Sequence, residues 1–132
     1  MKASSKPREK FRLVEFFKKA DGTKPVGDWL REVRAIDKAC AQSIAIGIRY
    51  FEEYPAAVVP TNIFEKVTAD IWEIKVHHGK EQFRLLSFPV GRSVIIAVHG
   101  LAKRTRALLD QDLKLAERRR TEYLARKKLK PG

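Results

Sequence analysis

The spacing of hydrophobic residues changes along the chain, and each change predicts a secondary-structure element. Residues 11–17 are rich in strand-forming side chains and are followed by the turn dipeptide Asp21-Gly22, so we expect a first strand there. A helix follows from Pro25, because proline is favoured in the first helical turn. Residues 37–53 carry a helical stripe, which predicts a second helix. The stripe has apolar residues at spacings of four and three: Ile44, Ile48 and Phe51.

The middle of the chain predicts three strands. In residues 71–76 the even positions are apolar, while Glu73 and Lys75 lie on the other face, as in a half-buried strand. Two more strands are expected at 82–88 and 93–99. Their connections are too short for parallel crossovers, so neighbouring strands run antiparallel. The last segment, from about Leu108 to Lys128, has a helical pattern.

This order of elements predicts one α+β domain. A small antiparallel sheet, formed by the N-terminal strand and a three-stranded meander, packs on two N-terminal helices and a C-terminal helix. We expect the first strand to lie beside the last. The 132-residue length suits a single domain. We assign residues 11–128 to it, with a flexible basic arm at 1–10 and a tail at 129–132.

The net charge of +12 is concentrated at the two ends of the chain. Residues 1–20 carry +5, residues 21–100 are neutral, and residues 101–132 carry +7. If the two ends meet in the fold, they form one basic face that attracts phosphate groups. Otherwise they are two solvated tails. The charge favours an anionic partner without identifying it.

Several classes of function are not indicated by the sequence. Cys40 is the only cysteine, which excludes an intramolecular disulfide, and we expect it in the core. The sequence has no glycine-rich phosphate loop, no Ser/His/Asp signature and no metal-site spacing, so we predict no metal and no cofactor. It also has no signal-peptide pattern and no apolar run of about 18 residues, so we expect a cytoplasmic protein without a membrane segment.

A polar set on the predicted sheet is the candidate site. Glu73 and Lys75 share a face, and Arg84 lies on the next strand. His99 ends the third strand, and more cations follow: Lys103, Arg104 and Arg106. We expect the side chain of Arg84 to be exposed on the open face of the sheet. The basic residues Lys75, Arg106, Arg118 and Arg119 are the candidate RNA contacts.

One carboxylate among several cations suits cleavage of an RNA phosphodiester. Glu73 would take the proton from a 2′-hydroxyl, and His99 would protonate the leaving 5′-oxygen. The phosphate oxygens would be held by Arg84 with Lys103 or Arg104. Structural alternatives remain open: Glu73 and Arg84 can form surface ion pairs, and His99 can be a structural histidine.

Three strings of residues carry a family resemblance: Ile71-Trp72-Glu73-Ile74-Lys75, Phe83-Arg84-Leu85-Leu86, and His99-Gly100-Leu101-Ala102-Lys103-Arg104-Thr105. Together they resemble the phage-derived toxins of the RelE/HigB superfamily, over a region from about Leu13 to Tyr123. The resemblance implies the toxin of a type II toxin–antitoxin system, an endoribonuclease that cuts messenger RNA on the ribosome and inhibits translation. The implied partners are messenger RNA, the ribosome and an antitoxin, commonly a helix-turn-helix protein from a neighbouring gene.

The resemblance also implies roles for individual residues. Arg84 matches the family arginine that usually follows a tyrosine, Lys75 matches a basic residue at the end of its strand, and the dipeptide Lys103-Arg104 matches the basic pair after the last strand. Three positions depart from the family pattern: Phe83, Leu109 and Asp112 replace the usual tyrosine, proline and glutamate. An alternative function is therefore a non-catalytic RNA- or DNA-binding regulator that uses the same basic face.

Overall fold

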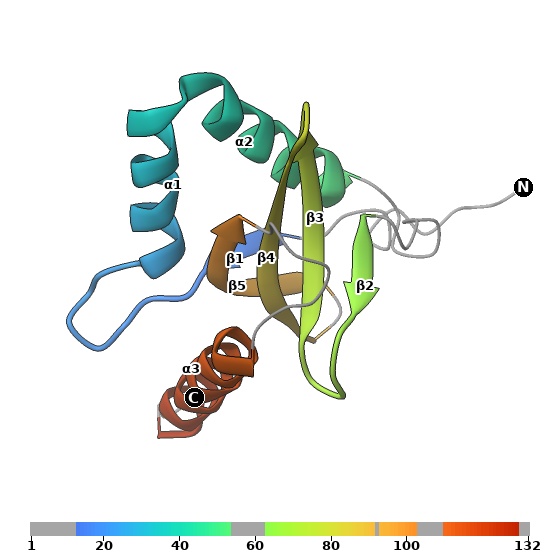
Figure 1. Cartoon of the computed structure of the whole chain (residues 1–132). Helices are drawn as coiled ribbons and strands as arrows, with labels where there is room; N and C mark the ends of the chain where they lie inside the picture. Colours follow the sequence, from blue (N-terminus) through green and yellow to red (C-terminus); the bar gives the residue numbers. More distant parts are fainter. Residues whose placement is uncertain (1–12, 54–62, 92, 103–109, 130–132) are drawn as a thin grey trace, which may run out of the picture.

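A single five-stranded sheet forms the centre of the molecule, shown in the computed structural model of Figure 1. The structure describes residues 13–53, 63–91, 93–102 and 110–129. The elements in chain order are β1 (Leu13–Phe16), α1 (Pro25–Ile36), α2 (Lys38–Glu53), β2 (Phe64–Lys66), β3 (Trp72–His78), β4 (Glu81–Val90), β5 (Val94–Ala102) and α3 (Asp110–Leu129). The predicted α+β class is confirmed.

The strands lie in the order β1-β5-β4-β3-β2. β1 runs parallel to β5, and the other neighbours are antiparallel. The predicted position of the first strand beside the last is therefore confirmed. The prediction of an antiparallel sheet was wrong for this strand, because the two helices between β1 and the later strands allow it to return in the parallel direction. The prediction of three later strands was incomplete, because β2 also joins the sheet by pairing with β3. With three residues, β2 is too short to show an alternating pattern in the sequence.

Helices cover both faces of the sheet. α1 and α2 pack on one face, and α3 packs on the opposite face (Figure 1). α2 begins after Asp37, whose carboxylate accepts hydrogen bonds from the backbone N–H groups of Ala39 (3.0 Å) and Cys40 (3.2 Å). Such a side chain satisfies N–H groups that have no partner in the first helical turn. Cys40 is buried, as predicted.

The central strand β4 is buried on both sides. Phe83 and Leu85 pack toward α1 and α2, whereas Leu86 and Phe88 belong to the cluster under α3. The register between β4 and β5 shifts at Leu86/Ser87. A strand with helices on both faces has little access to water, even where its sequence is polar.

α1 approaches the sheet closely at one glycine. Trp29 lies against Gly100 of β5, and a Cβ at Gly100 would overlap the indole ring. The same indole contacts Phe83 edge-on, with ring centroids 6.1 Å apart. Gly100 therefore allows Trp29 to close the interface between α1 and the sheet.

Candidate functional site

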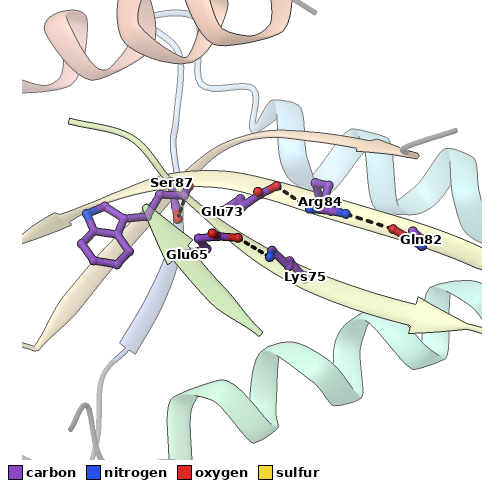
Figure 2. A network of polar contacts seen from close by, with 7 residues as sticks. Glu65, Glu73, Lys75, Gln82, Arg84 and Ser87 are labelled. Carbon is purple, nitrogen blue, oxygen red and sulfur yellow. Dashed lines mark hydrogen bonds and ion pairs between the residues drawn. The ribbon is translucent and has the colours of Figure 1, made fainter. Parts of the chain in front are cut away.

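Glu73 and Arg84 form an ion pair across β3 and β4. Nη1 of Arg84 donates to Oε1 of Glu73 at 2.8 Å, and Nη2 donates to Oε1 of Gln82 at 2.9 Å (Figure 2). Lys75 lies directly opposite Arg84 in the register. The predicted sharing of one face by Glu73, Lys75 and Arg84 is therefore confirmed, because residues opposite each other point to the same side.

The expectation that Arg84 is exposed was wrong. Arg84 and Glu73 are each only 8% exposed. The face that carries them also carries the apolar residues Leu86 and Phe88, which pack under α3. Both outer nitrogens of Arg84 are bonded to protein acceptors, and its Nε is buried without a partner in the described part of the chain. The guanidinium thus holds Glu73 instead of presenting an open fork to a phosphate.

A second pair extends this row to the edge of the sheet. Lys75 forms an ion pair with Glu65 of β2, and Glu65 lies opposite Glu73 in the register (Figure 2). Two carboxylates that face each other across strands repel. The cations Lys75 and Arg84 each pair with one of these carboxylates, so the charges of the group balance. Its four residues are Glu65, Glu73, Lys75 and Arg84.

His99 is held by the C-terminal helix. Its Nε2 lies 2.8 Å from Oδ1 of Asp112, in the first turn of α3, and both side chains are partly exposed. His99 and Glu73 both lie opposite Leu86, from the two sides of β4, so they share one face. This contact uses Nε2, which leaves Nδ1 as the second ring nitrogen of His99. This nitrogen can exchange a proton with a ligand while the carboxylate fixes the ring.

Sequence reasoning missed the contact between His99 and Asp112. It singled out Asp112 only as a departure from a family pattern, and no local spacing connects a strand end to a helix start thirteen residues later. Gln82, which accepts a hydrogen bond from Arg84, was also missed. A signal for Gln82 was present in the sequence, because residues two apart on a strand share a side and Gln82 lies two before Arg84.

The candidate RNA contacts of α3 differ from each other. Arg118 is exposed, whereas Nη1 of Arg119 donates to the carbonyl oxygen of Val98 at 2.8 Å and so ties α3 to β5. Burial, followed by the charge of Arg118, lowers the pKa of Arg119 from its ordinary value. Lys103, Arg104, Arg106 and Leu109 lie outside the described residues, as do the arm at 1–10 and part of the tail at 129–132.

The described parts of the two basic ends lie together. Nη2 of Arg126, near the end of α3, donates to the carbonyl oxygen of Lys18 at 2.6 Å. Lys18 and Arg126 also line one groove together with Lys24 and Lys127. A basic surface therefore exists at this place, on the side of β1.

Within the described ranges, no three His, Cys, Asp or Glu side chains gather closely enough to hold a metal ion. In the same part of the chain, no helix has both the length and the apolar character needed to cross a membrane.

The fold and site define a small α+β protein with a five-stranded mixed sheet between helices and a polar row on one face. The chain belongs to the family described as phage derived protein Gp49-like (DUF891), whose model matches residues 28–121. This family is known as toxin-like, of the HigB/RelE type in toxin–antitoxin systems, and membership supports the resemblance at that coarse level. A comparison with curated proteins found no match.

Proposed function

We propose that this protein is the toxin of a type II toxin–antitoxin system, an endoribonuclease that cuts messenger RNA on the ribosome in the cytoplasm and thereby inhibits translation. Family membership supports the toxin class. The observation that carries the catalytic part is the histidine His99, oriented by Asp112 on the face that also holds Glu73 and Arg84. A histidine fixed through one ring nitrogen leaves the other for proton transfer.

The proposed reaction uses the 2′-hydroxyl of the RNA as the nucleophile, so it needs no metal ion. The bond between the 2′-oxygen and phosphorus forms as the bond to the 5′-oxygen breaks, which leaves a 2′,3′-cyclic phosphate and a free 5′-hydroxyl. Glu73 takes the proton of the 2′-hydroxyl, and His99 gives a proton to the 5′-oxygen. Lys103 and Arg104 hold the phosphate oxygens.

The burial of Arg84 changes its part in this proposal. Since Nη1 and Nη2 are bonded to Glu73 and Gln82, Arg84 orients the carboxylate of Glu73 and does not itself bind phosphate. The RNA strand is then held by the remaining basic residues: Lys75, Arg106, Arg118 and Arg119.

The second candidate function is a non-catalytic RNA- or DNA-binding regulator. The observation that favours it is the burial of Glu73 in an ion pair, an arrangement that also suits a purely structural role. Both functions use the same candidate RNA contacts, so only the chemistry separates them; these contacts are Lys75, Arg106, Arg118 and Arg119.

Controlled expression tests the proposed function. The chain is induced with and without the neighbouring reading frame, while growth is followed and messenger RNA 5′ ends are mapped. We expect growth arrest, new 5′-hydroxyl ends within coding regions, and relief of both by the neighbour. His99→Gln should abolish the new ends, whereas His77→Gln, at an exposed position on β3, serves as the matched control and should not. Folded wild-type protein that binds ribosomes without producing new ends would favour the regulator.

A further inference from the structure

β1 is an edge strand: among the described residues, it pairs with β5 on one side and with no strand on the other. The N–H of Leu13 donates to Ser93 (2.7 Å) and that of Phe17 donates to Ala97 (2.9 Å), so the odd-numbered residues of this segment face β5. Backbone groups alternate along a strand, so the N–H and C=O groups of Val14 and Phe16 point to the outer edge of the sheet, away from β5. The N–H of Val14 donates to the carboxylate of Glu52 at 2.8 Å. The backbone groups of Phe16 come next along the same edge.

A groove of about 560 Å³ lies beside this edge, between β1 and the C-terminal half of α3. Four cationic side chains line it, against one carboxylate from Glu15; the cations are Lys18, Lys24, Arg126 and Lys127. Apolar groups of Phe17, Ile96 and Tyr123 also line it. The groove thus combines an open strand edge, apolar surface and positive charge.

The wall of the groove is fixed to the strand. Arg126 bonds to the carbonyl oxygen of Lys18 and to Glu122 (3.2 Å). Its guanidinium lies over the ring of Phe17, 5.3 Å from the ring centroid. These contacts hold α3 beside β1, so the groove is formed before any ligand arrives, which lowers the entropic cost of binding.

We infer that this groove binds an extended, acidic segment of a partner protein, which adds to the sheet as a strand next to β1. Strand addition gives affinity through backbone hydrogen bonds, and alternate side chains give specificity. On one side, the added strand would place apolar side chains against Phe17 and Ile96 and carboxylates near the four cations. A second copy of this chain fits poorly, since its own groove carries the same positive charge.

The partner class rests on the proposed function, in which the antitoxin is the protein that supplies the segment. The groove itself does not depend on that function, because it is defined by β1 and α3 and none of its lining residues belongs to the Glu73–Arg84 pair or the His99–Asp112 pair. Binding at the groove and cleavage of RNA can therefore be measured separately.

The test uses the full chain and a fluorescein-labelled peptide with the repeat Glu-Ser-Val-Ser, about ten residues long, which places Glu and Val in turn on one face of the strand. Fluorescence anisotropy is the readout. Charge reversal at the groove, in Lys18→Glu/Lys127→Glu, should weaken binding at least ~10-fold, because both carboxylate contacts become repulsive. Arg31→Glu/Arg34→Glu on α1 changes the net charge equally at another surface. This control should weaken binding by less than about threefold, through long-range charge alone.

A second peptide, methylated at alternate backbone nitrogens, tests strand pairing at constant charge. It should bind at least ~10-fold more weakly, since it cannot donate to the edge of β1. Equal binding of the two peptides would overturn strand addition, and equal loss in both charge variants would overturn the groove as the site. Two results would overturn the peptide as the occupant of the groove. One is a dimer of the free chain that is lost in the groove variant. The other is a uridine oligonucleotide that displaces the peptide and loses affinity only in the groove variant. Loss of RNA cleavage with normal peptide binding would leave this inference intact.

Discussion

Arg84 and Glu73 are joined by a 2.8 Å ion pair between neighbouring strands, with only 9% and 10% of their side chains exposed. Removing two charges from water costs free energy, which their attraction and further hydrogen bonds must offset. Gln82 supplies one such bond. The pair therefore depends on both members, since either charge alone would be buried without compensation.

We expect Arg84→Ala to destabilise the fold by about 3–5 kcal/mol, because it leaves the carboxylate of Glu73 buried and unpaired. Urea unfolding measures this change. The double variant Arg84→Met/Glu73→Leu removes both charges and should lose far less stability than the single one. An Arg84→Ala protein within ~0.5 kcal/mol of wild type would show that the pair is solvated like a surface pair.

The contact between His99 and Asp112 predicts a graded effect on cleavage. His99→Gln should reduce the single-turnover rate on programmed ribosomes by ~10²-fold or more, as expected for loss of a general acid. Asp112→Asn should have a smaller effect and should alter the pH–rate profile, because an amide cannot fix the same imidazole tautomer. Unchanged rate and pH profile in folded Asp112→Asn would remove Asp112 from the proposed mechanism.

Gly100→Ala should destabilise the fold by about 1–3 kcal/mol, since the added methyl group would overlap Trp29. Thermal unfolding is the measurement, and Trp29→Leu in the same chain should recover part of the loss. Gly27→Ala in α1 is the matched control. Its Cβ would lie 3.7 Å from the nearest atom, an ordinary contact, so the change should be neutral or stabilising. Similar losses in both variants would argue against a specific clash at Gly100.

Asp37 predicts a pH dependence of stability. Hydrogen bonds from Cys40, and then from Ala39, lower the pKa of the Asp37 carboxyl below its ordinary value of 3.8. A carboxyl with a lower pKa in the folded state stabilises the fold above its unfolded pKa, and this contribution is lost as the pH falls through the folded pKa.

The measurement for Asp37 is urea unfolding of wild type and Asp37→Ala at about pH 7 and about pH 2. At the higher pH, wild type should have a larger free energy of unfolding than Asp37→Ala, and this difference between the two proteins should shrink in acid. Asp37→Ser keeps an acceptor at the start of α2 without an ionisable group. Its stability relative to Asp37→Ala should therefore not depend on pH. Parallel pH curves for wild type and Asp37→Ala would instead exclude the carboxyl of Asp37 as the cause.

The fold was largely predictable because its signals are local. Proline at the start of α1, the stripe of Ile44 and Ile48, and the alternation in β3 each lie within one element. β2 was missed because three residues carry no period. Its place depends on Phe64, which stacks on Trp72 with ring centroids 4.6 Å apart, a contact between separate strands that no local pattern shows.

The candidate site was less predictable, because burial is a property of the whole sheet. The alternation in β3 and β4 gave the shared face of Glu73 and Arg84 correctly. It did not show that this face is covered as well. The run Leu85-Leu86, followed by Phe88, contained a usable signal, since apolar residues on both faces indicate a strand buried on both sides.

The pairing of β1 with β5 also has a consequence for the order of folding during synthesis. Leu13 pairs with Val94, so the first described strand has no partner until most of the chain has left the ribosome. Chains emerge from the N-terminus, and contacts between distant segments form slowly. β5 lies between β1 and β4, so β1 can join the sheet only after β5 has formed. His99 lies on this strand and Asp112 on the helix that follows. A nascent chain therefore completes its sheet and the contact between His99 and Asp112 at the same late stage, and shorter products have neither.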